Sequence, residues 1–463
     1  MTQRLRKHPF LTALAATNVA LVPMFSFQEG LSWIPQVTSV LLCLCAFVHY
    51  SRQKRNRKPI HPAIVAYVML TIWFGLPLLF RPMPSGYQTL VKVAVLAVAT
   101  YVVIDTKGQL LALLSAYALS SMIFVALNSE EIARLHIGAS TAVTTEAFAD
   151  SQRLSGTMVN ANDVGMFGVV CLSFAACILF SMRGRARYAI ALAVILCSGP
   201  ITWYSGSRKA MLGSCLIVGA WAGAYGWRKH ADRPSELKVI HREPWMGSRA
   251  RQKRTGRVDR LKGIALCGGG LLLMWKLVSL SPYFIRLAGF GVAGDLDSSG
   301  EVRLDMAKTA IRLWLESPVL GHGYQAFEMI SGFHVYSHSS PAELLCNGGI
   351  VALALYLVFL FIPLRQAIKG GRLCGNKEEW SLYFGIVVYH VSVLFFSMFC
   401  VFFNSRDYIP IAAAMCGYLQ ANNARLRANH VPMWPQPRRG GQDALLESVL
   451  TTAEKRDLGK PGQ

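Results

Sequence analysis

Residues 341–364 read PAELLCNGGIVALALYLVFLFIPL, an apolar run that carries no charge after Glu343. A transmembrane helix needs about 20 mostly apolar residues, so a run of this length can cross a bilayer. Comparable runs recur along the chain, which is 53% hydrophobic and only 16% charged. The sequence therefore predicts an all-α, polytopic membrane protein with about twelve transmembrane helices, at residues 10–27, 32–50, 63–80, 88–104, 110–127, 163–180, 188–204, 210–227, 264–280, 341–364, 381–403 and 406–422.

Lysine and arginine are concentrated in the loops on one side of this predicted bundle. Of the 47 such residues, 35 lie in the termini and loops of one side, ten lie in the loops of the other, and two lie within spans. Because basic residues concentrate on the cytoplasmic side, the pattern places both termini in the cytoplasm. Contact with anionic lipid headgroups accounts for the net charge of +22, so we expect membrane lipids, and no nucleic acid, as partners.

The loops divide the chain further. Residues 1–422 form the predicted membrane domain, with extracytoplasmic loops at 128–162 and 281–338 and a basic cytoplasmic loop at 228–263. The tail 423–463 is basic, contains proline and lacks apolar periodicity, so we expect it to be disordered in the cytoplasm.

The loop 281–338 contains one evident helix, at residues 301–315. Apolar residues recur along it at helical spacing beside cationic positions. The stripe consists of Leu304, Ala307, Ile311 and Trp314. We expect this extracytoplasmic helix to rest on the membrane surface or to cap a cavity between spans.

A short turn on the external side carries Arg208 and Lys209. Charged side chains at the membrane edge are costly and need a reason, although two cations that merely reach from a helix end into water are the plain alternative. Ser207 precedes a helix that begins near Ala210, so free backbone N–H groups, a hydroxyl and a guanidinium point to one spot. The turn predicts an anion site suited to a phosphate, because arginine presents a planar fork of donors.

His338 closes the long external loop. Its ordinary pKa of ~6.5 lets it take a proton at neutral pH, so it can serve as general base to a hydroxyl; a structural or solvated loop histidine is the alternative. Glu343, in the span that follows, is expected to orient the histidine or to bind sugar. The spacing does not decide among the competitors in the same loop, which are His322, His334, Asp295 and Asp297.

Other residues carry weaker signals. Arg303 and Arg312 are nine residues apart on the predicted helix, so they do not share a face, and each alone is a solvated surface charge. The first external loop, residues 28–31, has no paired acids for a metal, and the chain has no phosphate-binding loop or dinucleotide fingerprint. All cysteines fall in predicted spans or a cytoplasmic loop, where we expect them to be buried apolar residues. We therefore expect a site without metal or cofactor.

Four short stretches occur together in a distinctive order. They are RLSGTMVNAN at 153–162, SGSRKAMLG at 205–213, Arg303 followed by SPVLGHGY at 317–324, and HSSPAELLCNGGI at 338–350. In order, spacing and predicted layout they resemble the bacterial O-antigen ligase and O-antigen polymerase superfamily, whose members are polytopic lipid-linked glycan transferases. The resemblance covers residues 10–420.

The resemblance implies a metal-independent transferase of the bacterial inner membrane that faces the periplasm. Its donor is a glycan on undecaprenyl diphosphate, and its acceptor is a hydroxyl of a lipid or a glycan. The superfamily's pattern assigns the diphosphate to arginines, here Arg208 and Arg303 with Lys209 beside them, and the base to His338. The implied reaction inverts the anomeric carbon. Supporting or glycan-binding roles fall on Arg153, Asn160, Asn162, Ser207, Arg312, Tyr324 and Glu343.

The acceptor stays open at this point. Where the ligases usually have His-Asn, this chain has His338-Ser339, and the Ser-Arg-Lys of residues 207–209 is found as much in polymerases. Transfer to lipid A–core, extension of another lipid-linked glycan and transfer to a protein all fit the donor site. A transporter of lipid-linked sugars is a second class of function, against which stand the long polar external loops and the lack of broken helices in corresponding halves.

Overall fold

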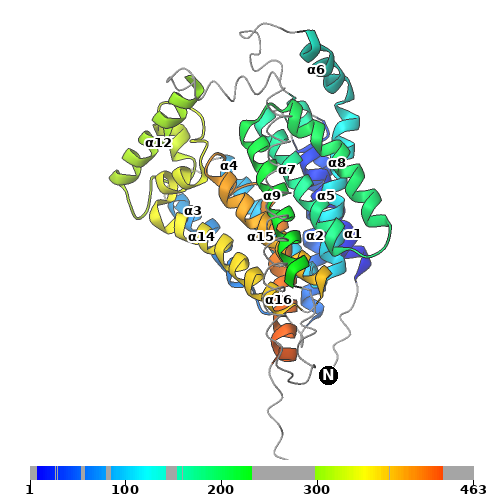
Figure 1. Ribbon diagram of the computed structural model, residues 1–463. Coiled ribbons are helices and arrows are strands. Elements are labelled where there is room, and N and C mark those ends of the chain that lie inside the picture. Colours follow the sequence, from blue (N-terminus) through cyan, green and yellow to red (C-terminus); the bar gives the residue numbers. More distant parts are fainter. Residues whose placement is uncertain are drawn as a thin grey trace, which may run out of the picture. The chain divides into compact units, whose positions relative to one another are not determined.

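The computed structural model describes residues 8–26, 28, 30–53, 58–79, 85–141, 154–158, 160–231, 298–374 and 376–430, and the secondary structure of these residues is entirely helical. The helices are shown in Figure 1. They are α1 (Pro9–Phe25), α2 (Trp33–Arg52), α3 (Pro62–Gly75), α4 (Ser85–Val103), α5 (Lys107–Leu127), α6 (Ser129–Thr141), α7 (Ala161–Ser181), α8 (Ala186–Tyr204), α9 (Arg208–Ala231), α12 (Ser298–Glu316), α13 (Ala326–Ile330), α14 (Ser340–Leu373), α15 (Lys377–Ser397) and α16 (Tyr408–His430). The chain divides into two compact units, residues 1–422 and 423–463.

The predicted all-α class is confirmed over the described residues. Eleven of the twelve predicted spans coincide with helices, and the remaining one, 264–280, lies outside the described residues. Seven helices are long and apolar enough to cross a membrane, namely α2, α4, α5, α7, α8, α14 and α15, and shorter apolar helices lie at Pro9–Phe25, Pro62–Gly75 and Lys209–Ala224. The total of twelve spans and the extracytoplasmic position of the loops stay predictions.

The end of α15 differs from the prediction. The apolar run to residue 403 predicted a continuous span, but the helix ends at Ser397. Residues 398–407 connect α15 to α16, and they are tied to the start of α14 by hydrogen bonds such as the one that Ser340 Oγ donates to the Cys400 carbonyl at 2.7 Å. Hydropathy does not distinguish an apolar connection packed in protein from a helix in lipid. The predicted span therefore extends beyond the end of the helix.

The helix α7 lies in the middle of the bundle, between α5, α8, α9 and α15. Asn160 caps its N-terminus by accepting the Asn162 N–H at 2.9 Å, which is the usual role of asparagine at this position. Two glycines on α7 allow close approach, because a Cβ at Gly165 would meet the Ser205 hydroxyl and one at Gly168 would meet the Thr202 hydroxyl. The turn between α8 and α9 is thereby held against the first turns of α7.

The helix α14 is broken near its start. Gly349 adopts φ 65° and ψ −165°, which interrupts the helical hydrogen bonds. The loop before α13 replaces them: the carbonyls of Cys346 and Asn347 accept the N–H groups of His322 and Gly323 at 3.0 and 2.8 Å. No side chain fits at this crossing, since a Cβ on Gly349 would meet a backbone carbonyl of the same loop.

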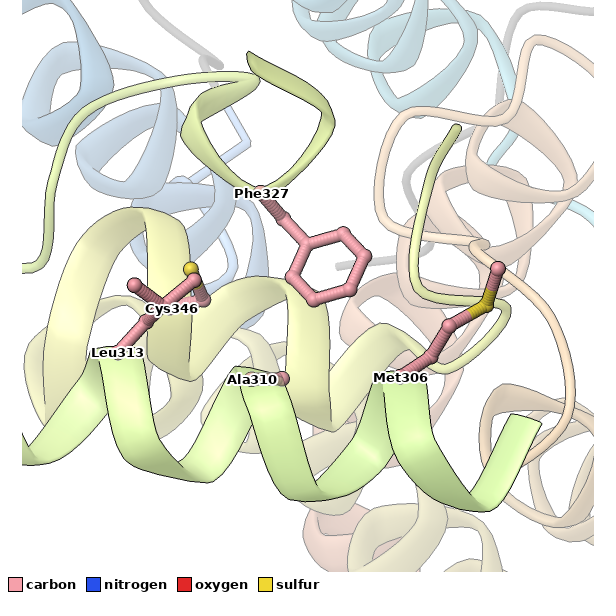
Figure 2. Packing of buried hydrophobic residues seen from close by; sticks show 5 residues of the cluster. All are labelled: Met306, Ala310, Leu313, Phe327 and Cys346. Carbon is pink, nitrogen blue, oxygen red and sulfur yellow. The ribbon is translucent and has the colours of Figure 1, made fainter. Parts of the chain in front are cut away.

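The helix α12 packs on α13 and α14 through a face that the sequence did not predict. Its buried side chains are Met306, Ala310 and Leu313, which contact Phe327 of α13 and Cys346 of α14 (Figure 2). The stripe of Leu304, Ala307, Ile311 and Trp314 that the sequence singled out is not this packed face, because Leu304 is 46% exposed and Ile311 is 50% exposed. The helix carries apolar residues on two faces, and periodicity alone does not say which one meets protein. The two expected positions of this helix, on the membrane surface or over a cavity between spans, stay predictions.

Candidate functional site

A cavity of about 260 Å³ lies where α7, α9 and α14 meet the loops around α13 and the connection between α15 and α16. Five carboxamides, three carboxylates, one ammonium and one imidazole line it, together with aromatic and small side chains. The lining residues are Asn160, Asn162, Asp163, Lys209, Tyr324, Gln325, Glu328, Tyr336, His338, Glu343, Asn347, Cys400, Val401, Phe403 and Asn404.

His338 is the only one of the three described loop histidines that lines this cavity. Its ring lies against Tyr336, with the centroids 4.4 Å apart. The other two histidines are placed elsewhere: the His322 ring pairs with the Leu313 carbonyl at 2.7 Å, and His334 is exposed. The alternative acids Asp295 and Asp297 lie outside the described residues.

The electrostatic surroundings keep His338 neutral. Burial is the largest cause, and the charges of Arg303 and Lys209 add to it, so that the pKa of His338 falls from 6.5 to about 4. At pH 7, three pH units higher, only about one His338 in a thousand carries a proton. An imidazole in this state offers a lone pair to an incoming hydroxyl proton.

Glu343 holds the backbone beside His338 and does not contact its ring. Its Oε2 accepts the Ser337 N–H at 2.7 Å and its Oε1 accepts an N–H of the Asn347 side chain at 2.9 Å. The carboxylate is only 4% exposed, so both hydrogen bonds lie in a protected environment. Of its two predicted roles, this geometry agrees with the orientation of the histidine segment.

Lys209 brings positive charge into the cavity from the first turn of α9. Its Nζ donates to the Phe399 carbonyl at 3.2 Å and to Cys400 Sγ at 2.6 Å. Two residues before it in the chain, Ser207 is buried, and within the described part of the chain its Oγ has no hydrogen-bond partner. An unpaired hydroxyl and an ammonium at one helix N-terminus are groups that can bind an anion.

The structure describes only some of the predicted arginine side chains. Arg208 begins α9, but its side chain is outside the described residues, as is all of Arg153. Arg303 is exposed on α12, and its charge acts on both His338 and Tyr336. Arg312 is also exposed, on the opposite side of the same helix, and neither Arg303 nor Arg312 lines the cavity.

Three further predicted residues, Asn160, Asn162 and Tyr324, do line the cavity. Asn160 caps α7 and also bonds the Tyr336 side chain, next to Asn162. Tyr324 is buried, and its hydroxyl accepts an N–H of Asn404 at 3.2 Å.

Sequence reasoning missed several lining residues. Asp163 directly follows the quoted stretch 153–162 and could have been found from that position, whereas Gln325, Tyr336 and Asn404 carry no signal of their own. Gln325 shows a left-handed φ of 61°, and its Oε1 accepts the Gly86 N–H at 3.2 Å. Such a backbone in a non-glycine residue is often found at functional sites.

Cys400 corrects another expectation. The sequence placed it inside a span as a buried apolar residue, but it lies in the connection after α15 and its thiol contacts Lys209 at the cavity wall. Burial raises the pKa of this thiol, although Lys209 opposes the shift. The thiol therefore stays protonated at neutral pH.

Comparison with known proteins agrees with this site. Residues 193–357 match the model of the family described as O-antigen ligase. The matched segment runs from α8 into α14 and includes Lys209, Arg303 and His338. The predicted resemblance is thereby confirmed for residues 193–357, which hold three of the four quoted stretches, whereas the stretch 153–162 lies outside the match. The match points to a membrane glycosyltransferase of surface-polysaccharide biosynthesis with lipid-linked glycan substrates. No curated protein sequence matches the chain significantly.

Proposed function

We propose that this protein moves an undecaprenyl-diphosphate-linked glycan to an acceptor hydroxyl at the outer face of the bacterial inner membrane. The observation that carries the proposal is the shared cavity of His338 and Lys209, with the charge of Arg303 acting on the same imidazole. A neutral imidazole can accept a proton, and the cations can hold a diphosphate. The similarity to the O-antigen ligase family supports this combination.

The reaction is an in-line displacement. The acceptor hydroxyl gives its proton to a ring nitrogen of His338 while its oxygen forms a bond to the anomeric carbon. The bond from that carbon to the diphosphate oxygen breaks, and the configuration inverts. Lys209, Arg303 and Arg208 stabilise the negative charge that builds on the leaving diphosphate, so the chain's own cations supply the electrostatic stabilisation.

Donor binding would also activate the base. The cations that lower the pKa of His338 are the ones that the diphosphate neutralises. With the diphosphate bound, the pKa of His338 rises from about 4 toward its ordinary value of ~6.5. The imidazole is therefore a stronger base when the donor is present than when the cavity is empty.

Charge topology supports the location of the reaction. The loops with most of the lysine and arginine face the cytoplasm under the positive-inside rule, and both termini lie with them. His338 and Lys209 belong to the opposite set of loops, which faces the periplasm. The lipid part of the donor stays in the outer leaflet, and the glycan stays in water.

The test of this function is His338→Ala in the native host. We expect surface polysaccharide to be lost and lipid-linked glycan to accumulate, because no general base takes the proton of the acceptor hydroxyl. The matched control is His334→Ala, since His334 lies in the same loop, also has a left-handed φ, and is exposed. Normal polysaccharide from a well-expressed His338→Ala protein would refute the assignment of the base.

A polymerase is the alternative within the same chemistry, because the Ser339 that follows His338 departs from the common ligase pattern. Both enzymes would use the same donor cavity, so the products of a deletion strain separate them. Full-length polymer left on the lipid carrier indicates a ligase, and single repeat units indicate a polymerase.

A further inference from the structure

His338 sits in a backbone conformation that few side chains adopt, with φ 58°. A non-glycine residue stays in the left-handed region only where its surroundings hold it there. In the part of the chain that the structure describes, no hydrogen bond fixes the His338 ring, which only lies against Tyr336. The position of the imidazole therefore depends on the backbone on either side of it.

That backbone is held from both sides by the start of α14. On one side, the Ser337 N–H donates to Glu343 Oε2 at 2.7 Å. On the other side, Ser339 is the N-cap of α14, and its hydroxyl accepts the Ala342 N–H at 3.5 Å. The shorter and more deeply buried of these contacts is the one to Glu343.

Glu343 belongs to a chain of hydrogen bonds with a fixed direction. Asn347 donates from its side-chain nitrogen to Glu343 Oε1 at 2.9 Å, and its oxygen accepts the Phe327 N–H at 2.8 Å. Both ends of the chain, Ser337 and Phe327, are backbone N–H donors that cannot reverse. Between two fixed donors, the pair of side chains must therefore supply three acceptors and one donor, as one carboxylate and one carboxamide do.

This chain joins the base to a rigid part of the protein. Asn347 is 1% exposed, and Phe327 belongs to the packed cluster with Met306, Ala310 and Leu313 of α12 (Figure 2). The packing of α12, α13 and α14 is therefore transmitted to the segment that carries His338. The hydrogen bonds of the carboxylate go to Ser337 and Asn347, not to the imidazole.

We infer that Glu343 is a positioning residue for the base, and that it acts through the Ser337 N–H and depends on the direction of its hydrogen bond with Asn347. The inference rests on the proposed function, because it concerns His338 in that role. Glu343 does not exchange a proton with substrate. Any pair of side chains that supplies the same acceptors and the same single donor can replace Glu343 and Asn347.

The decisive test exchanges the two groups. Glu343→Gln leaves two carboxamides between two N–H donors, so one donor always faces another. Asn347→Asp leaves two carboxylates, so two acceptors face each other. The double variant Glu343→Gln with Asn347→Asp restores every hydrogen bond with the carboxylate moved by one helical turn.

Activity is measured as the rate at which glycan leaves its lipid carrier in membrane vesicles from the native host, which contain the natural donor and acceptor. We expect kcat/KM of each single variant to fall roughly 10- to 100-fold, and the double variant to recover most of the loss. Asn347→Asp should also regain activity as the pH is lowered from about 8 to about 6, because a proton between the two carboxyls restores the missing donor. In Glu343→Gln, a loosened and better solvated His338 should move the acid limb of the pH profile upward from about 4.

Each outcome decides the matter. Recovery in the double variant supports the positioning role, whereas a double variant as inactive as Glu343→Gln would show that the carboxylate itself is needed at position 343. A fully active Glu343→Gln would overturn the inference but leave the proposed function standing, provided that His338→Ala is inactive. An active His338→Ala would overturn both. The melting temperature of each variant in detergent separates the loss of activity from loss of the fold.

Discussion

Replacement of Arg303 by glutamine should move the acid limb of the pH–rate profile upward. In the free protein the pKa of His338 is held at about 4 by burial first, then by Arg303, then by Lys209. The neutral imidazole is the active form, so activity is present above this pKa and is lost as the pH falls through it. Removing a positive charge makes protonation easier, which raises the pKa and brings the loss of activity to a higher pH.

The size of the effect has an upper bound. The pKa of His338 lies about 2.5 pH units below 6.5, and Arg303 is a smaller cause than burial. Arg303 therefore accounts for less than half of that interval, and the acid limb should rise by no more than about 1.2 pH units. Even after such a rise the histidine remains mostly neutral at pH 7, so any loss of rate there reflects weaker stabilisation of the diphosphate.

The assay compares kcat/KM with kcat between about pH 3 and about pH 8, since the first reports the free enzyme and the second the complex with donor. The protein is reconstituted with lipid-linked glycan extracted from the host. In the unchanged protein, the acid limb of kcat should lie above that of kcat/KM, because the bound diphosphate cancels the cations. In Arg303→Gln, the two limbs should move closer together.

Arg312→Gln is the matched control, because Arg312 is exposed on the same helix but does not act on His338. Its profile should match that of the unchanged protein. An acid limb that stays in place in Arg303→Gln, or one that moves equally in both variants, would refute the electrostatic link between α12 and the base.

Three further predictions follow from the packing. Gly349→Ala should lower the stability by about 2 kcal/mol or more, because its Cβ would meet a loop carbonyl at a left-handed φ; the melting temperature should fall, while that of Gly199→Ala, which has open space around it, should not. A fluorophore on Ile311→Cys should be quenched by lipids with brominated acyl chains, and one on Asp305→Cys by aqueous iodide; quenching of both by iodide and of neither by brominated lipid would exclude α12 from the membrane boundary. His322→Ala should cost about 1 kcal/mol of stability through the lost hydrogen bond to a carbonyl of α12, yet leave the acid limb unchanged, and a shifted limb would argue against a purely structural role.

Hydropathy predicted the helices well, because the spans are encoded by the length of their apolar runs. It failed where apolar residues serve a purpose other than contact with lipid. The connection after Ser397 is apolar because it packs against α14, and α12 is apolar on two faces because one of them packs on Phe327. In both places the deciding partner is distant in sequence.

The residues of the candidate site also fall into two kinds, those that a local sequence pattern reveals and those that only the fold brings together. His338, Lys209 and Asn160 could be found because they lie in short stretches with a recognisable pattern, and the structure brings these three to one cavity. Tyr336 and Asn404 could not be found, because they are ordinary polar residues whose importance comes from the fold alone. The role of Glu343 was open in the sequence, since the backbone N–H that it accepts is determined by a tertiary turn.

The interruption of α14 has a consequence for biogenesis. Two carbonyls within this helix accept the N–H groups of His322 and Gly323, and bare carbonyls in hydrocarbon cost several kcal/mol each. The ribosome makes residues 322–323 before α14, so under the predicted topology their N–H groups are translocated before the helix leaves the translocon. Maturation of the span and of the loop is thus a single event, and a nascent chain that mispairs them would expose polar backbone to the membrane proteases that remove unassembled helices.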